Sequence, residues 1–400
     1  MKLLYDISIS LYSAGVRLAA LTGNKKAKDW IDGRKNSFQT SHQGAIWFHC
    51  ASLGEYEQIT PLFEPLKKIY DKPVIVSFFS PSGFQYFQKH QNPLVDDFFY
   101  LPLDTEANAN RLIYHLKPTV FFLVKYELWH RLISKLHDEK VPCYFLSARI
   151  KNSTIKNDLF FGFNSLNKFR QVFTNDHTSQ QRLLNQNINN ILIGDTRYDK
   201  ALINQKESFD YSFNFKKDLP ILILGSCWSD DLEIFEKELN WILNHFNLVI
   251  APHEINPAKI NEINNTLSSF KVKIEKYSQS EKSSYDVLII DSIGQLKYLY
   301  RYAHVAYIGG GFKTGLHNII EALIYKIPVI IGPKHHQFPE AIDAIESNAA
   351  FPIANSNELK LTLERLLNSD YSESIEIFVA SQLGASQKLI DYIKKEVTNQ

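Results

Sequence analysis

Three short runs rich in β-branched residues, separated by segments of helical length, constrain the fold of this chain most strongly. The runs are Val287–Ile290, Val305–Ile308 and Val329–Ile331. Runs of this kind that alternate with helices are typical of βαβ units, whose parallel strands are buried on both faces. The stretch therefore predicts a parallel sheet covered by helices.

A glycine turn follows the second of these runs and indicates a ligand site. Gly309, Gly310 and Gly311 would let the backbone approach a ligand closely, because glycine has no side chain. A helix expected to begin near Asn318 would present free N–H groups and partial positive charge to a phosphate. Asn318 and Glu321 also fit a capping box, which is the structural alternative. The spacing is not that of the dinucleotide fingerprint G-x-G-x-x-G.

The same alternation begins at residue 46 and predicts an α/β fold with two doubly wound, Rossmann-like halves that face a central cleft. Ligands of such halves bind at the carboxyl ends of the strands. A polar segment that we interpret as aperiodic predicts a linker between the halves. The predicted parts are an N-terminal amphipathic segment (1–35), an N-terminal α/β domain (36–204), the linker (205–218), a C-terminal α/β domain (219–380) and a C-terminal helix that packs back across both domains (381–400).

Length and composition limit the class of protein. The 400 residues suffice for two domains with separate cores, and the formal net charge of +1 argues against a large nucleic-acid-binding surface. Cys50, Cys143 and Cys227 are scattered and lack the spacing of a metal site. An odd, small number of cysteines fits a reducing cytoplasm rather than a disulfide framework.

The apolar N-terminal segment indicates a membrane-surface helix. Lys2, Asp6 and Arg17 make it a poor spanning helix, and a clean signal-peptide cleavage site is absent. The pattern predicts one apolar helical face and a basic run near anionic headgroups. A helix packed on its own domain is the alternative. The residues concerned are Leu3, Leu4, Ile7, Leu11, Val16 and Leu18, followed by Lys25, Lys26 and Lys28.

Eight segments give the chain a family resemblance. It resembles the Kdo transferases, which move 3-deoxy-D-manno-octulosonic acid (Kdo) from CMP-Kdo to a lipid A precursor in lipopolysaccharide inner-core biosynthesis. The resemblance implies an inverting glycosyltransferase of the glycosyltransferase-B fold at the cytoplasmic face of the inner membrane. The N-terminal domain would bind the acceptor and the C-terminal domain would bind CMP-Kdo. The segments are HCASLGEYEQITPL, YLPLD, KYELWH, SAR, GDTRYD, DSIGQLKYLY, GGGFKTGLHNIIEA and PVIIGP.

The resemblance implies a catalytic role for Glu55, which stands where the family places its base. A base is needed because a sugar hydroxyl must lose its proton as it attacks the anomeric carbon. The alternative is that Glu55 only favours a helix N-terminus through the macrodipole. Arg197 stands where the family usually has a lysine proposed to stabilise the transition state; a solvent-exposed arginine is the alternative.

Lys125 is the largest departure from the family pattern. The family motif commonly reads Glu-Thr-Glu-Leu-Trp, whereas this chain has Lys125 in place of the first glutamate. A charge reversal cannot conserve the electrostatic role of that glutamate. Glu127 could supply a carboxylate, although two residues of extended chain move it roughly 6–7 Å. Lys125 could instead bind the acidic donor or an acceptor phosphate.

The resemblance also implies contacts with CMP. Asn318–Glu321 matches the nucleotide-binding tetrad of the family, and two further segments occupy its other CMP positions. The implied contact residues are Pro252, His253, Ile293, Gly294, Gln295, Asn318, Ile319, Ile320 and Glu321.

No metal or other cofactor is expected, because CMP-Kdo is a substrate and the histidines lack ligand spacing. His317 is interpreted as a polar group of the cleft. Two other functions are compatible with the pattern. One is another nucleotide-sugar transferase or an epimerase of the same fold; the other is a catalytically degenerate protein that binds lipid A precursors.

Overall fold

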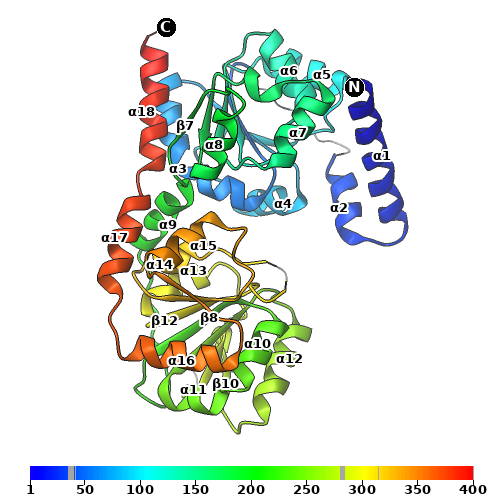
Figure 1. Ribbon diagram of the computed structural model, residues 1–400. Helices are drawn as coiled ribbons and strands as arrows, with labels where there is room; N and C mark the ends of the chain where they lie inside the picture. The colour runs from blue at the N-terminus through cyan, green and yellow to red at the C-terminus, as the bar shows by residue number, and fades with distance from the viewer. Residues whose placement is uncertain (35–39, 41, 280–283, 314, 400) are drawn as a thin grey trace. The chain divides into compact units, whose positions relative to one another are not determined.

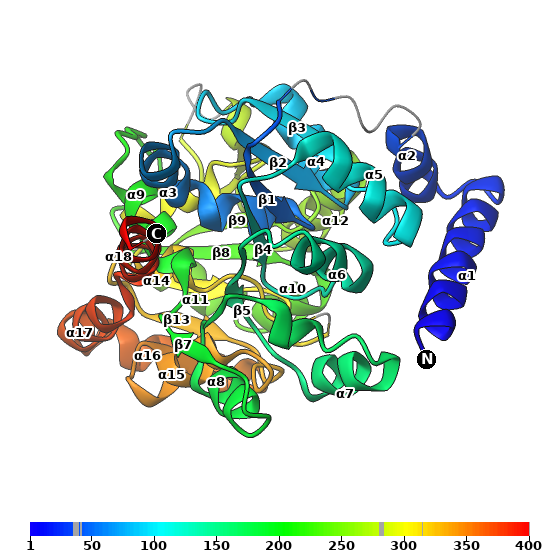
Figure 2. The same cartoon turned by 90° about the horizontal axis from the view of Figure 1, so that it is seen from above.

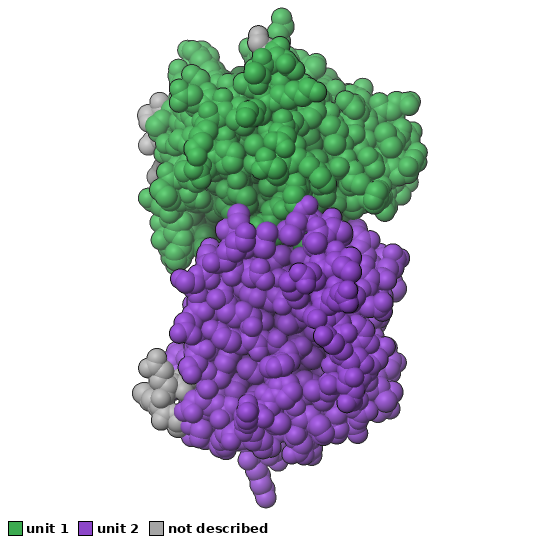
Figure 3. All heavy atoms as spheres, turned by 90° about the vertical axis from the view of Figure 1, so that its left-hand side faces the viewer, with its two compact units in different colours: residues 1–200, 384–400 green, residues 201–383 purple. Residues whose placement is uncertain are grey.

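The computed structural model describes residues 1–34, 40, 42–279, 284–313 and 315–399. The chain forms two compact units (Figures 1 and 3). Unit 1 comprises Met1–Lys200 and Gly384–Gln400, and unit 2 comprises Ala201–Leu383. The predicted boundary between residues 35 and 36 lies outside the described residues.

Unit 1 contains a seven-stranded parallel sheet in the order β3-β2-β1-β4-β5-β6-β7. The strands are β1 (Ile46–Cys50), β2 (Val74–Phe78), β3 (Asp97–Tyr100), β4 (Val120–Val124), β5 (Cys143–Ala148), β6 (Gln171–Thr174) and β7 (Asn190–Leu192). The helices are α1 (Lys2–Leu21), α2 (Lys25–Arg34), α3 (Leu53–Tyr70), α4 (Pro81–Lys89), α5 (Glu106–Leu116), α6 (His130–Asp138), α7 (Asn152–Phe161), α8 (His177–Leu184) and α18 (Ala385–Thr398). Helix α9 (Thr196–Lys206) begins in unit 1 and ends in unit 2.

Alternating side chains of the central strands build a core on each face of this sheet. Trp47 and Phe121 lie in one buried cluster, whereas their sequence neighbours Phe48 and Phe122 lie in the other. Successive residues of a strand point to opposite faces, so strands buried on both faces must be apolar throughout. Helices α5 and α6 cover one face, and α3 and α18 cover the other (Figure 2).

Unit 2 repeats the design with the strand order β10-β11-β9-β8-β12-β13-β14, again all parallel. The strands are β8 (Ile221–Cys227), β9 (Asn247–Pro252), β10 (Ile274–Lys276), β11 (Val287–Ile289), β12 (Val305–Ile308), β13 (Val329–Ile331) and β14 (Ala350–Pro352). The helices are α10 (Ser229–Glu236), α11 (Leu239–His245), α12 (Pro257–Ser268), α13 (Leu296–Leu299), α14 (Ile320–Leu323), α15 (Pro339–Glu346), α16 (Ser356–Leu367) and α17 (Ser372–Gln382).

The segment 205–218, which we predicted as a linker, packs within unit 2. Tyr211, Phe213 and Phe215 occupy every second position, and each contacts another aromatic ring of this unit. The ring of Phe215 meets that of Tyr285 edge to face, with centroids 4.9 Å apart. The segment is therefore not aperiodic: aromatic and polar residues alternate, which is the period of an extended chain with one buried face.

The C-terminal helix α18 belongs to unit 1. Leu389 and Ile393 enter the core cluster that includes α3. At its start, the backbone N–H groups of Gly384 and Ser386 donate to the carboxylate of Asp199 at 2.7 and 2.6 Å. An acidic side chain at a helix N-terminus also interacts favourably with the helix dipole.

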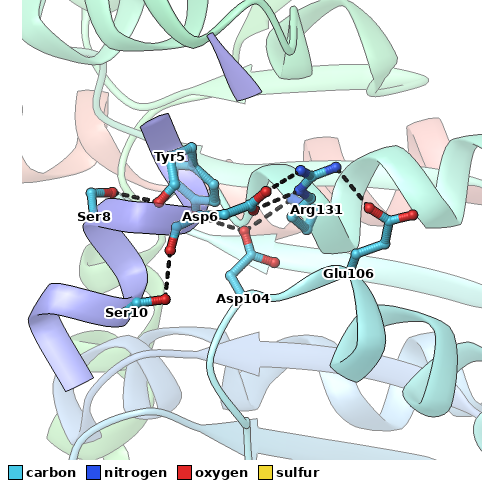
Figure 4. Close-up of polar contacts among 7 residues, drawn as sticks. All are labelled: Tyr5, Asp6, Ser8, Ser10, Asp104, Glu106 and Arg131. Carbon is cyan, nitrogen blue, oxygen red and sulfur yellow. Dashed lines mark hydrogen bonds and ion pairs between the residues drawn. The ribbon is translucent and has the colours of Figure 1, made fainter. Parts of the chain in front are cut away.

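Helix α1 packs on the rest of unit 1 through polar contacts (Figure 4) and through aromatic contacts of Tyr5. Tyr5 is its only buried residue, and the Tyr5 hydroxyl donates to Asp104 at 2.6 Å. Asp104 also accepts from the backbone N–H groups of Arg131 and the next residue, both at 2.9 Å, at the start of α6. Asp6 accepts two hydrogen bonds from the guanidinium of Arg131.

The apolar side of α1 faces away from this attachment. Leu3, Leu11, Leu18 and Leu21 are 70%, 67%, 64% and 85% exposed, and Val16 of the predicted apolar face is half-buried. The helix is thus held on its domain without burying its leucines. In the part of the chain that the structure describes, no helix has the length and apolar character needed to cross a membrane.

Candidate functional site

Glu55 lies where the strand order of unit 1 reverses. The chain runs from β1 through β2 to β3 and returns to place β4 on the other side of β1. Such a reversal is where doubly wound sheets bind ligands, outside the carboxyl ends of the strands. Glu55 stands in the first turn of α3, directly after β1. Lys125 follows the neighbouring strand β4, so both residues flank the reversal.

The carboxyl group of Glu55 is buried, with 6% of the residue exposed, and accepts from the backbone N–H of Ala51 at 2.5 Å. Burial raises its pKa to about 7; the nearby Glu127 also raises it, while the bond from Ala51 and the charge of Lys125 oppose the shift. A pKa near neutrality suits a general base. The hydrogen bond from Ala51 N also fits the alternative in which this carboxylate favours the start of α3.

Lys125 adopts a strained backbone conformation with φ +76°. Its backbone N–H donates to Leu146 O at 3.0 Å, and its carbonyl accepts from Arg149 N at 3.2 Å, so the turn is fixed to β5. A left-handed conformation at a residue other than glycine is costly and is often found at functional sites. The charge of Lys125 acts on both Glu55 and Asp195. Glu127, two residues on, is exposed.

Arg197 is not a solvent-exposed arginine. Its Nε donates to Asp195 Oδ2 at 2.9 Å, and its Nη2 donates to the same oxygen at 2.5 Å. Burial raises the pKa of Asp195, but the charge and hydrogen bonds of Arg197 outweigh it and hold that pKa below its usual range. Sequence reasoning missed Asp195, although it stands in the same GDTRYD segment.

Ser147 is a second residue that sequence reasoning missed. It is fully buried near the end of β5, has φ +48°, and forms a hydrogen bond between its Oγ and Thr196 Oγ1 at 2.9 Å. The contact joins the SAR and GDTRYD segments, which were noted only as parts of the resemblance. Ser226 in unit 2 also has a positive φ, +52°, at the end of β8.

His49 is buried within the core of unit 1. It is 1% exposed, its Nδ1 contacts Ser77 Oγ at 2.9 Å, and burial lowers its pKa to about 3. Its ring packs edge to face on Trp129. Among the residues that the structure describes, no three His, Cys, Asp or Glu side chains are grouped as metal ligands would be.

The glycine turn after β12 packs backbone on backbone, which differs from the phosphate loop that we expected. The N–H of Gly309 donates to Gly225 O at 2.8 Å, and that of Gly310 donates to Asp231 Oδ2 at 2.9 Å. A Cβ on Gly309 would lie 2.3 Å from Ser226 O. Two of the three N–H groups are therefore committed within the protein, and glycine is required by close packing.

The predicted capping box at Asn318 does not form, because α14 begins at Ile320 and has only four residues. Asn318 Oδ1 accepts instead from Ile320 N at 3.2 Å, and Asn318 Nδ2 donates to Glu321 Oε1 at 3.1 Å. Ile319 and Ile320 are fully buried. Only their backbone groups remain for any contact with a nucleotide.

The other expected CMP residues lie at the end of β9 and in loops of unit 2. Ile293 is 85% exposed and Gly294 has φ +90°, in the loop between β11 and α13, with Gln295 half-buried beside them. Pro252 is the last residue of β9 and is buried. His253 follows it and is exposed.

Comparison with known proteins shows similarity to Kdo transferases. Residues 26–200 match a family model described as 3-deoxy-D-manno-octulosonic-acid transferase (kdotransferase). A curated relative named 3-deoxy-D-manno-octulosonic acid transferase, from Aquifex aeolicus, is 28% identical over 82% of this chain and 87% of its own length. A relative of the same name from Haemophilus influenzae is 26% identical over 87% of this chain and 86% of its own length. The chain is similar to these Kdo transferases over most of its length.

Solved structures show the same fold. A UDP-N-acetylglucosamine 2-epimerase aligns over 90% of this chain and 97% of its own, with a TM-score of 0.63 and 14% identity. The Neisseria meningitidis protein of that name aligns over 88% of this chain and 100% of its own, with a TM-score of 0.61 and 14% identity. The predicted glycosyltransferase-B-like fold is thereby confirmed. The residues matched by the family model include Glu55, Lys125, Glu127 and Arg197.

Proposed function

We propose that this protein transfers Kdo from CMP-Kdo to a hydroxyl group of a lipid A precursor with inversion at the anomeric carbon. Its similarity to Kdo transferases supports the transfer of Kdo. The observation that carries the mechanism is the buried carboxyl group of Glu55, whose pKa is about 7, at the strand-order reversal of unit 1.

In the proposed step, Glu55 accepts the proton of the acceptor hydroxyl. The hydroxyl oxygen forms a bond to the anomeric carbon of Kdo while the bond from that carbon to the phosphate oxygen breaks. CMP leaves with the electron pair. Lys125 and Arg197 supply positive charge for the donor carboxylate or the departing phosphate. The step uses no metal or other cofactor.

Unit 2 is proposed to hold CMP. Its support is the match of Asn318–Glu321 and of two loop segments, 252–253 and 293–295, to the nucleotide-binding positions of the family. Asn318 and Glu321 already contact one another, which orients both side chains at the carboxyl edge of the sheet.

The acceptor is a lipid, so the enzyme must work at a membrane surface, and we propose the cytoplasmic face of the inner membrane. The exposed leucines of α1, tied to unit 1 through Tyr5 and Asp6, would lie in the interface. Lys25, Lys26 and Lys28 are exposed at the start of α2 and would meet anionic headgroups.

The test of this function is a transfer assay. The purified protein is incubated with CMP-Kdo and a lipid A precursor, and the product is examined by mass spectrometry. We expect a product heavier by one or more Kdo residues. Binding of the precursor without transfer would favour the degenerate binding protein. Epimerisation of UDP-N-acetylglucosamine without Kdo transfer would favour the epimerase.

Replacing Leu11 and Leu18 together with glutamine should weaken binding to anionic vesicles at low salt by roughly tenfold or more, because a buried leucine side chain contributes about 1.5–3 kcal/mol. Vesicle sedimentation measures this. Leu361→Gln is the matched control, since Leu361 is 64% exposed on α16 of unit 2. Equal binding of the double variant and the wild type would remove α1 from the membrane contact.

A further inference from the structure

Three aromatic rings meet at the carboxyl edge of the sheet of unit 2. Trp228 directly follows β8, His253 directly follows β9, and His317 lies in the loop between β12 and α14. The three strands are neighbours, and the strand order reverses between β8 and β12. Trp228 and His317 thus face each other across the point where doubly wound sheets bind their ligands.

A hydrogen bond fixes the tautomer of His317. The indole Nε1–H of Trp228 donates to Nε2 of His317 at 2.8 Å. An indole N–H can only donate, so Nε2 must be the unprotonated nitrogen. The neutral ring therefore carries its proton on Nδ1.

Stacking holds the ring and covers one of its faces. The rings of His253 and His317 are parallel within 19°, with centroids 4.3 Å apart, and Trp228 stacks on His253 at the same distance. The backbone N–H of His317 donates to Gly309 O at 3.2 Å. Burial and the neighbouring His253 lower the pKa of His317 to about 4, so the ring stays neutral at physiological pH.

The Nδ1–H of His317 is left as a donor at the ligand-binding edge. Within the described part of the chain it has no hydrogen-bond partner, and the residue is half-buried next to Asn318. The N–H groups of Gly309 and Gly310 in the same loop are already committed. With a face covered and Nε2 occupied, the ring offers an edge with an N–H donor, which suits a phosphate oxygen rather than a stacked base.

We propose that the Nδ1–H of His317 donates to a phosphate oxygen of the nucleotide, and that Trp228 is the positioning residue that holds His317 in this tautomer. The inference rests on the proposed function, because CMP is the nucleotide that this function requires.

The tautomer is tested directly in the full-length protein labelled with ¹⁵N-histidine. A long-range ¹H–¹⁵N spectrum separates protonated from unprotonated ring nitrogens, and His317→Asn assigns the signals. We expect the proton on Nδ1 in the wild type and a change of the Nδ1 signal when CMP is added. A proton on Nε2 would overturn the role of Trp228. An Nδ1 signal that does not change when CMP binds would overturn the proposed contact.

Calorimetry with CMP tests the contribution to binding. His317→Ala should weaken binding by about 10- to 100-fold, the usual effect of losing a hydrogen bond to a charged group. His317→Asn keeps an N–H donor near the position of Nδ1 and should lose less. Trp228→Phe keeps the stack but leaves Nε2 of His317 without its donor. The pH dependence of CMP affinity in this variant should therefore differ from that of the wild type.

Helix α11 supplies matched controls. Trp241 and His245 form another stacked pair in unit 2, with centroids 4.2 Å apart, and His245 Nδ1 contacts the backbone oxygen of Trp241 at 2.8 Å. Trp241→Phe and His245→Ala should bind CMP as the wild type does. Similar losses in these controls would show that the effect of Trp228 and His317 is not specific.

The outcomes separate this inference from the proposed function. A protein that binds CMP through His317 but transfers no Kdo contradicts the function and supports the inference. A protein that transfers Kdo while His317→Ala binds CMP normally contradicts the inference alone. Absence of CMP binding by the wild type contradicts both.

Discussion

Replacing Glu55 with glutamine should lower Kdo transfer by about 10²–10⁴, the usual contribution of general-base catalysis. Glutamine keeps the shape of the side chain and can still accept from Ala51 N, but it cannot take the proton of the acceptor hydroxyl. The transfer rate with CMP-Kdo and a lipid A precursor measures the loss. Glu64→Gln is the matched control, because Glu64 is an exposed glutamate on the same helix.

The same variant should be more stable than the wild type at pH 8. The folded-state pKa of Glu55 is raised from 4.5 to about 7, so the folded protein binds this proton more tightly than the unfolded chain does. The cost of ionisation appears as pH rises above the unfolded pKa and is complete above the folded pKa. Glu55→Gln removes up to ~3 kcal/mol of this cost. If Glu55 only favoured the start of the helix, Glu55→Gln should instead lose roughly 0.3–1 kcal/mol of stability and keep near-normal transfer.

Replacing Asp195 with alanine should lower the free energy of unfolding by about 3–5 kcal/mol, because the guanidinium of Arg197 would remain buried without its carboxylate. The side chains of Arg197 and Asp195 are 16% and 8% exposed. Denaturant unfolding followed by far-UV circular dichroism measures the change. Glu106→Ala is the control: Glu106 pairs with Arg131 at 3.1 Å, but its side chain is 71% exposed, so the cost should be below about 1 kcal/mol.

The pair also predicts a pH dependence of stability. The folded-state pKa of Asp195 is held below its usual value, so its contribution is present above the unfolded pKa and is lost as pH falls through the folded pKa. The difference between the wild type and Asp195→Ala should therefore shrink below about pH 4. A difference that stays constant into acid would show that the carboxylate charge is not its source.

In unit 2 the sequence predicted the central strands well and the edge strands poorly. The runs at 305–308 and 329–331 coincide with β12 and β13, because strands buried on both faces need continuous apolar residues. Strands β10 and β14 were missed. Each has three residues and lies at an edge of the sheet, where β10 is half-buried throughout. A short edge strand that is not fully buried needs no continuous apolar run, so the pattern that marked β12 and β13 is absent.

The site was predictable where it depends on position along a strand. Glu55 and Lys125 follow β1 and β4, and this alone places them at the carboxyl edge of the sheet; the catalytic role of Glu55 stays a prediction. Contacts between distant residues were not predictable, since Trp228 and His317 are 89 residues apart in sequence. A glycine run indicates close approach of a backbone, and only the structure shows that the neighbour of Gly309 is Ser226 rather than a ligand.

The pH profile of kcat/KM for Kdo transfer tests the role of Glu55 most directly, because this parameter reports the pKa values of essential groups in the free enzyme. Glu55 must be ionised to act as the base, and its pKa is about 7. We predict that kcat/KM rises tenfold per pH unit below pH 7, levels off above it, and that the residual activity of Glu55→Gln lacks this limb. A wild-type profile without a limb near pH 7, or the same limb in Glu55→Gln, would contradict the assignment of Glu55 as the catalytic base.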